Sequence, residues 1–314
     1  MSTVLVTGHK NPDTDSIASA IVYAYLKNEL GVHAQPVRLG EVNKETAYAL
    51  DYFQVEAPVF ADENVQQGVE ELILVDHNEA QQSIDARENF NVIEVIDHHR
   101  IANFETMAPL YYRAEPVGCT ATILLKLFKE NNVDIPKDLA GLMMSAIISD
   151  SLLFKSPTCT DEDVQAAKEL ASIADTNLES YGLNMLKAGA DMSDKTADDL
   201  LTIDAKTFDA GANKLEIAQV NTVDVEDVLK SKDLVSDRMD EIIREKQLSV
   251  FIFVITDIIN SDSTIVVRGD DSDKVECAFD ISLHDDTAVL KGVVSRKKQI
   301  APVLMKEFST KEKV

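Results

Sequence analysis

Clusters of aspartate and histidine follow three runs of the sequence that read as buried strands. The strand-like runs span residues 3–7, 71–75 and 91–96. The clusters after them span residues 8–16, 75–78 and 97–100. In an open parallel sheet, ligand sites form beyond the carboxyl ends of the strands. We therefore expect these polar side chains to meet at one edge of a parallel sheet.

The first half of the chain alternates strand-like runs with helical patterns, which is typical of βαβ units. The spacing of apolar residues predicts helices over residues 16–30, 117–131, 139–148, 163–174 and 178–187. The sequence thus predicts an α/β fold, with an N-terminal parallel-sheet domain and helices on its flanks.

The pattern changes near the small, polar stretch Ala188-Gly189-Ala190-Asp191. Beyond it we expect strands over 215–220, 249–257, 264–268 and 288–294, with one amphipathic helix over 225–245. This is typical of a smaller, mixed α+β domain. The predicted organisation is a parallel-sheet domain (1–188) that contains all three acidic clusters, a linker or hinge (189–195) and a second, smaller domain (196–314).

Composition narrows the class of protein. The net charge is −25 and aromatic residues make up 6% without tryptophan, which argues against nucleic-acid binding. No apolar run approaches the roughly 18 residues that span a bilayer, so no membrane association is expected. Three scattered cysteines, Cys119, Cys159 and Cys277, read as buried free thiols. With no basic-then-apolar segment at the start, the sequence predicts a cytoplasmic protein.

The first cluster offers His9, Asp13 and Asp15 as candidate metal ligands. Pro12 delays the helix that follows, so the intervening loop can turn two carboxylates toward one point. Taken alone, aspartates at this place more often cap a helix.

The other candidates come from separate segments. Asp76 follows an apolar run, where a lone aspartate often forms a turn. His98 and His99 are adjacent, so both cannot point into a core from one strand. Asp150 closes a buried helix, where a carboxylate is costly unless it is paired, metal-bound or reaches solvent.

Two histidines and four aspartates without a thiolate favour Mn²⁺ or Mg²⁺, with Co²⁺ as an alternative, over structural zinc. Six protein ligands exceed the needs of one catalytic ion, and two ions bridged by a carboxylate fit the number. Such a centre suits hydrolysis of a phosphoanhydride or a phosphodiester.

Positive charge for an anionic substrate is concentrated late in the chain. Ser295-Arg296-Lys297-Lys298-Gln299 is dense in cations, and Lys206 is a further candidate. Arginine and lysine are the usual phosphate-binding side chains. A basic surface turn is an equally good interpretation of Arg296 and Lys297, and a solvated surface lysine is the better one for Lys206. If these groups bind phosphate, the active site would lie in the cleft between the domains.

These motifs together resemble the family II, manganese-dependent inorganic pyrophosphatases of the DHH phosphoesterase superfamily. The Asp97-His98-His99 triplet indicates the superfamily, and the segment from Ser295 to Gln299 selects the pyrophosphatases within it. The resemblance covers nearly the whole chain.

The resemblance implies roles for individual residues. One ion would be held by His9, Asp13 and Asp76, and the other by Asp15, Asp76, His98 and Asp150. Substrate would contact His99, Lys206, Arg296 and Lys297, and Mg²⁺ would accompany pyrophosphate. Asp97 would orient a histidine. The family also implies a homodimer joined through the N-terminal domains.

The leading hypothesis is therefore hydrolysis of inorganic pyrophosphate to two phosphates by a water that two metal ions activate. The alternative is a DHH-type phosphodiesterase or exopolyphosphatase acting on short oligonucleotides, cyclic dinucleotides or polyphosphate. The glycine-rich segment typical of those relatives is not found here. A noncatalytic metal-binding sensor is a third hypothesis, which no feature of the sequence favours.

Overall fold

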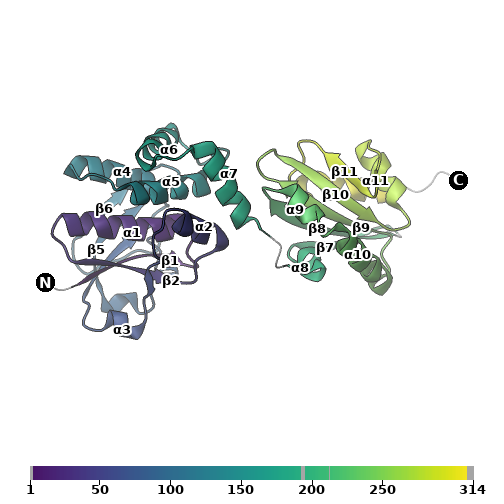
Figure 1. Ribbon diagram of the computed structural model, residues 1–314. Helices are drawn as coiled ribbons and strands as arrows, with labels where there is room; N and C mark the ends of the chain where they lie inside the picture. The colour runs from purple at the N-terminus through teal and green to yellow at the C-terminus, as the bar shows by residue number, and fades with distance from the viewer. Residues whose placement is uncertain (1–2, 192–194, 212, 310–314) are drawn as a thin grey trace. The chain divides into compact units, whose positions relative to one another are not determined.

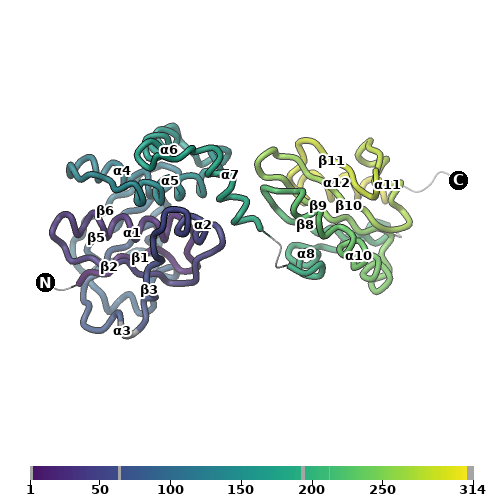
Figure 2. Tube along the Cα trace, viewed as in Figure 1, coloured from purple at the N-terminus to yellow at the C-terminus, as the bar shows by residue number. Residues whose placement is uncertain are grey.

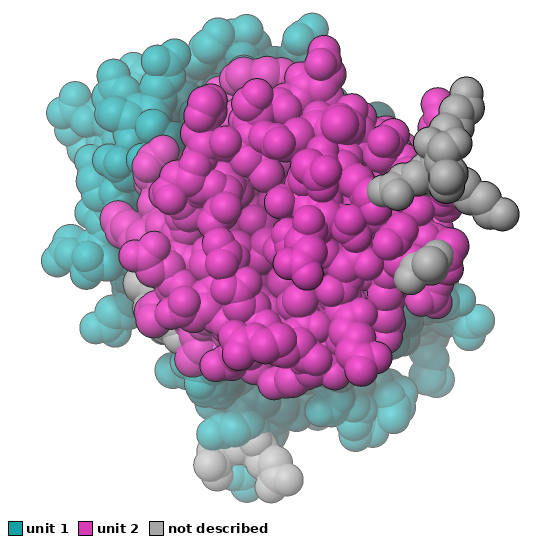
Figure 3. All heavy atoms as spheres, turned by 90° about the vertical axis from the view of Figure 1, so that its right-hand side faces the viewer, with its two compact units in different colours: residues 1–189 teal, residues 190–314 magenta. Residues whose placement is uncertain are grey.

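The computed structural model describes residues 3–191, 195–211 and 213–309. The chain forms two compact units, Met1–Gly189 and Ala190–Val314 (Figure 3). Each unit has its own sheet, with helices packed against it (Figure 1).

The first unit contains a six-stranded sheet in the order β3-β2-β1-β4-β5-β6, in which each pair of neighbours is parallel. The strands are β1 (Val4–Lys10), β2 (Ala34–Leu39), β3 (Val59–Phe60), β4 (Glu71–Val75), β5 (Asn91–Asp97) and β6 (Tyr111–Ala114). The apolar runs of β1 and β4 occupy the centre, where a parallel strand is covered on both faces. The parallel sheet that the sequence predicts is confirmed.

Helices connect these strands and continue after them (Figures 1 and 2). They are α1 (Thr14–Glu29), α2 (Lys44–Tyr52), α3 (Glu63–Gln66), α4 (Thr120–Asn131), α5 (Lys137–Ser151), α6 (Asp161–Ala174) and α7 (Leu178–Gly189), with short 3₁₀ turns at Ala80–Gln82 and Arg87–Asn89. Helix α1 packs on β1 and β2, and also on α5. Helix α5 is buried nearly all round, as its uniformly apolar sequence predicts.

The second unit contains a five-stranded mixed sheet in the order β11-β10-β9-β8-β7. Its strands are β7 (Ala205–Ala210), β8 (Asn213–Thr222), β9 (Val250–Asp257), β10 (Asp262–Arg268) and β11 (Thr287–Leu290). Strands β8 and β9 are parallel, and the other neighbours are antiparallel. Two apolar clusters, one containing Ile252 and the other Phe253, form its core, because successive side chains of β9 point to opposite faces.

The helices of the second unit are α8 (Ala197–Thr202), α9 (Val225–Leu229), α10 (Lys232–Lys246), α11 (Ser272–Phe279) and α12 (Ala301–Ser309), with a π-helical turn at Arg296–Ile300. The single helix expected over residues 225–245 is wrong. The Ser231 amide donates to the Val228 carbonyl in a tight turn, which separates α9 from α10.

Two other expectations need correction. Strand β11 ends at Leu290, not at residue 294, because the chain turns at Gly292 with a φ of +69°. Of the three free cysteines, Cys119 is buried, but Cys159 is partly exposed and Cys277 is exposed. The expected linker lies partly outside the described residues, at 192–194, and helix α7 runs through Gly189. No helix in the described ranges is long and apolar enough to cross a membrane.

Candidate metal centre

The six candidate ligands of the first unit come from the ends of five elements. His9 lies near the end of β1, and Asp76 and His98 directly follow β4 and β5. Asp15 lies in the first turn of α1, and Asp150 in the last turn of α5. The parallel strands bring their carboxyl ends to one edge of the sheet, which is why these distant residues meet there.

Asp76 lies at the centre of the group. Its Oδ2 atom is 3.5 Å from His9 Nε2, and its Oδ1 atom is 3.3 Å from His98 Nε2. The two oxygens of one carboxylate thus face two different histidines. The Asp76 backbone has a φ of +59°, a left-handed conformation that aspartate tolerates better than most residues.

Asp13 and Asp150 extend the group on its two sides. Asp13 Oδ2 is 3.4 Å from His9 Nε2, and Asp13 Oδ1 accepts a hydrogen bond from the Ser16 amide. Asp13 therefore caps α1 with one oxygen and faces His9 with the other. Asp150 Oδ2 and Asp15 Oδ2 lie 3.8 and 4.0 Å from His98 Nε2.

A backbone carbonyl orients the ring of each of the two histidines, His9 and His98. The Nδ1 atom of His9 lies 2.8 Å from the Lys10 carbonyl oxygen, and that of His98 lies 3.1 Å from the Val117 carbonyl oxygen. A ring that donates its Nδ1 proton to a carbonyl leaves Nε2 free to bind a cation. In both residues, Nε2 is the atom that faces the carboxylates.

Excess negative charge determines how the cluster holds protons. Burial raises the pKa of Asp15 to about 7, with a further contribution from the charge of Asp76. Burial and the same neighbouring carboxylates raise the pKa of Asp150 well above its usual range. Burial opposes protonation of the histidines, but hydrogen bonds and charges from the aspartates outweigh it and raise the pKa of His9 to about 11 and of His98 to about 9.

These residues fit divalent cations. Asp76 Oδ2 is buried and has no hydrogen-bond partner among the described residues, although a buried carboxylate oxygen without one is costly. Two triads, His9-Asp13-Asp76 and Asp76-His98-His99, each bring three ligand atoms within 4.8 Å of one another. A cation would neutralise the charge that otherwise raises the pKa of the histidines.

Two further residues of the histidine clusters have different surroundings. Asp97 Oδ1 accepts hydrogen bonds from the His99 amide and lies 2.9 Å from His99 Nδ1, while Asn78 Nδ2 donates to Asp97 Oδ2. Asp97 therefore orients His99, whose side chain is half exposed. His77 is buried between the Val75 carbonyl and the Ser83 hydroxyl, and burial lowers the pKa of His77 to about 4. It is a core histidine.

The basic candidates all lie in the second unit. Lys206 is exposed on β7, and Lys297 is exposed in the π-helical turn. Arg296 is buried, and its guanidinium donates to the carbonyl and carboxylate oxygens of Asp204. Arg296 and Lys297 line a hollow of about 450 Å³ with Gln219. Lys206 does not line it.

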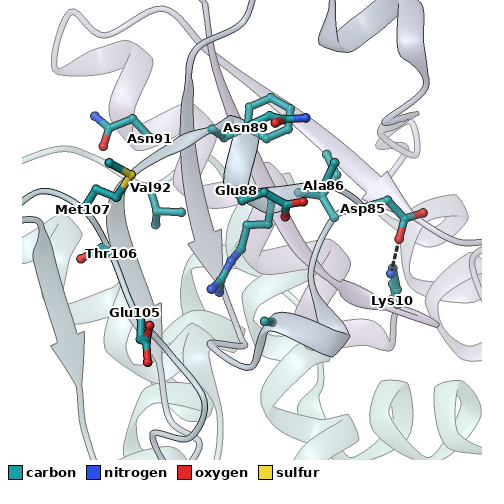
Figure 4. A pocket seen from close by; sticks show the side chains of 14 residues that line it. Lys10, Asp85, Ala86, Glu88, Asn89, Asn91, Val92, Glu105, Thr106 and Met107 are labelled. Carbon is teal, nitrogen blue, oxygen red and sulfur yellow. Dashed lines mark hydrogen bonds and ion pairs between the residues drawn. The ribbon is translucent and has the colours of Figure 1, made fainter.

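A larger hollow, of about 700 Å³, lies elsewhere in the first unit (Figure 4). It is lined by Lys10, Asp85 and Arg87 together with apolar side chains such as Val92 and Met107, and Lys10 pairs with Asp85. None of the six candidate ligands lines it. A search for the functional site by cavity volume would therefore miss the candidate metal centre.

Sequence reasoning missed the residues that surround the ligands. Thr120, Ala121 and Ser19 donate hydrogen bonds to Asp15, and Thr120 also donates to Asp76. The predicted helix began at residue 117, which placed Thr120 in its interior. A Thr just after Gly118-Cys119 is the one available sign of a helix start here.

Comparison with known proteins agrees with this architecture. The model of the DHH family N-terminal domain matches residues 3–147, and that of the DHHA2 domain matches residues 183–307. The manganese-dependent inorganic pyrophosphatase of Bacillus subtilis is 62% identical over 304 residues, which cover 97% of this chain and 98% of that protein.

Two solved structures share the fold. A Methanococcus jannaschii protein assigned to the family II inorganic pyrophosphatases is 39% identical, with a TM-score of 0.61 over 98% of this chain and 100% of that one. An exopolyphosphatase-related protein from Bacteroides fragilis is 13% identical, with a TM-score of 0.52 over 98% of this chain and 91% of that one, and it shows the fold alone. Near-complete alignment at high identity confirms the resemblance read from the motifs, and this chain belongs to the family II, manganese-dependent inorganic pyrophosphatases.

Proposed function

We propose that this protein hydrolyses inorganic pyrophosphate to two phosphate ions and depends on manganese. The observation that carries the proposal is the close approach of two histidines and three aspartates to Asp76, whose two carboxylate oxygens face different histidines. The names of the most similar relatives support the same reaction and the same metal.

The ligand assignment follows the contacts within the cluster. His9, Asp13 and Asp76 would hold one Mn²⁺, and Asp76, His98, Asp15 and Asp150 would hold a second. Each chain would thus hold two ions, with Co²⁺ or Mg²⁺ as alternatives and Mg²⁺ accompanying the substrate. When bound, the two cations supply an activated water nucleophile and stabilise charge on the phosphoryl oxygens.

The chain's own residues would position the substrate and balance its charge. His99, held by Asp97, can donate a hydrogen bond to a phosphate oxygen near the ligands. Lys206 and Lys297 present exposed ammonium groups, and Arg296 contributes positive potential while Asp204 holds its guanidinium. We assign these four residues to catalysis and substrate binding, because positioning and charge neutralisation supply most of the catalysis in phosphoryl transfer.

Substitution of one of the two exposed lysines, Lys297, tests the assignment. Lys297→Ala should lower kcat/KM for pyrophosphate by about 10–100-fold, because a charge-assisted contact to phosphate is lost. Lys298→Ala removes a neighbouring exposed lysine and should stay within about threefold of the wild type. Steady-state phosphate release measures both, and equal effects of the two substitutions would contradict the role of Lys297.

We further propose a homodimer joined through the first unit. Strand β6 is an edge strand of its sheet and begins with the exposed Tyr111. Two further exposed apolar side chains, Ile101 and Met107, lie in the segment that leads into this strand. An open edge of this kind can pair with a second copy. We also propose a cytoplasmic location, with which the three free cysteines agree.

A charge placed on this edge tests the dimer. Tyr111→Lys should raise the dimer dissociation constant by about tenfold or more, because the interface would bury an unpaired ammonium. Val289→Lys changes an exposed residue on β11, the edge strand of the other sheet, and should leave the constant unchanged. Analytical ultracentrifugation measures both variants. A monomeric wild type, or a shift caused only by Val289→Lys, would contradict the proposed interface.

A further inference from the structure

The start of helix α4 donates hydrogen bonds to the carboxylates of two proposed ligands and lies near that of a third. The Thr120 hydroxyl donates to Asp76 Oδ1 at 3.1 Å, and the Thr120 amide donates to Asp15 Oδ2 at 2.6 Å. The Ala121 amide donates to Asp15 Oδ1 at 3.2 Å. Cys119 Sγ lies within 4.8 Å of carboxylate oxygens of Asp15 and Asp150. The first backbone amides of a helix have no partner within the helix, and here two of them donate to the carboxylate of a proposed ligand, Asp15.

The same short segment also orients a histidine. The Val117 carbonyl oxygen lies 3.1 Å from His98 Nδ1, which leaves Nε2 for the metal. Residues 117–121 therefore contact three of the six proposed ligands, Asp15, Asp76 and His98, and Cys119 lies within 4.8 Å of a fourth, Asp150. These four are the set assigned to the second ion, including the residue shared with the first.

A buried carboxylate fixes this segment in place. Asp163, which is fully buried at the start of α6, accepts from the Gly118 amide at 2.8 Å and from the Thr122 hydroxyl at 2.6 Å. It also accepts from the Thr160 amide and hydroxyl. A Cβ atom at Gly118 would lie 2.7 Å from Asp163 Oδ2, so a larger residue there would force Asp163 to shift. The start of α4 is therefore a rigid frame.

We propose that Thr120 is a positioning residue of the metal centre: its hydroxyl holds the carboxylate of Asp76 so that one oxygen faces His9 and the other faces His98. This inference rests on the proposed function. Thr120 is fully buried, and its hydroxyl donates to the ligand that both ions would share. Without that donor the carboxylate can rotate, and loss of such an outer hydrogen bond to a ligand typically weakens metal binding by about 10–100-fold.

Three substitutions separate positioning from packing. Thr120→Val keeps the shape and removes the hydroxyl, and Thr120→Ser keeps the hydroxyl and removes a methyl group. Thr222→Val is the matched control, because Thr222 is a buried threonine of the second unit whose hydroxyl also donates a hydrogen bond, to the Asp224 carbonyl. Equilibrium binding of Mn²⁺ to the metal-free proteins, followed by the electron paramagnetic resonance of free Mn²⁺, gives dissociation constants without reference to activity.

We expect Thr120→Val to raise the Mn²⁺ dissociation constant of the weaker site at least tenfold, while Thr120→Ser and Thr222→Val stay within about threefold. A folded Thr120→Val protein with wild-type affinity would overturn the inference, as would equal losses in Thr120→Val and Thr222→Val. If Thr120→Val does not fold, a tenfold loss in Thr120→Ser would overturn it, and wild-type affinity in Thr120→Ser would support it. Failure of the wild type itself to bind Mn²⁺ would instead contradict the proposed function.

Discussion

Replacing Asp76 with asparagine is expected to lower kcat for pyrophosphate hydrolysis by about 1,000-fold or more. Among the described residues, Asp76 is the one whose two oxygens face both His9 and His98, so its charge would serve both ions. Asparagine keeps the size but offers a neutral oxygen and an amide that repels a cation. A 1,000-fold loss corresponds to about 4 kcal/mol of the activation barrier, within the several kcal/mol that metal-ion catalysis supplies.

The control for this substitution is Asp85→Asn, the same chemical change on an exposed carboxylate that pairs with Lys10 beside the larger hollow (Figure 4). It should keep kcat within about twofold. The rise in Tm that Mn²⁺ produces in the wild type should also disappear in Asp76→Asn and persist in Asp85→Asn. An Asp76→Asn protein that retains a tenth of the wild-type kcat would contradict the central place of Asp76.

Complete removal of metal is expected to abolish activity, and added Mn²⁺ should restore it. The six proposed ligands lie close together, and none of the described side chains around them offers an evident replacement for a cation that activates water. Phosphate release from pyrophosphate, measured after chelation and then after addition of single metals, should show activity at the chelated background and full recovery with Mn²⁺. Residual activity that is independent of any metal would contradict the mechanism.

The metal-free protein should also lose stability as the pH rises from about 6.5 to about 9. In the folded chain the pKa of His98 is raised to about 9 and that of His9 to about 11, whereas an unfolded histidine loses its proton near 6.5. The folded state therefore binds more protons in this range, so its stability falls with rising pH. Thermal unfolding should show this decline in the metal-free protein and a smaller one with Mn²⁺. A Tm that is constant or rises over this pH range would contradict the raised pKa values of His9 and His98 in the folded protein.

The parallel sheet, and the closeness of the candidate ligands at its edge, could be predicted because both depend on local patterns. Strand-like runs that end in aspartate or histidine fix where His9, Asp76 and His98 emerge, and parallel pairing brings those ends together. The place of Asp150 beside His98 agrees with the expectation that a carboxylate at the end of an apolar helix needs a partner.

Contacts between distant segments could not be predicted in this way. Thr120 bonds to Asp15 across 105 residues, and no periodicity links the two positions. Arg296 read as an exposed phosphate-binding group, but the carbonyl of Asp204, 92 residues away, holds its guanidinium in a buried position. The single helix expected over 225–245 was wrong for a local reason. The tight turn at Ser231 divides it into two helices, although the spacing of apolar residues continues across the turn.

The most direct test is a crystal structure of the Mn²⁺-loaded protein with anomalous diffraction recorded at the manganese edge. We predict two peaks about 3.5–4 Å apart, one bound by His9 and the other by His98, with an oxygen of Asp76 on each. A single peak, or manganese bound away from Asp76, would contradict the account.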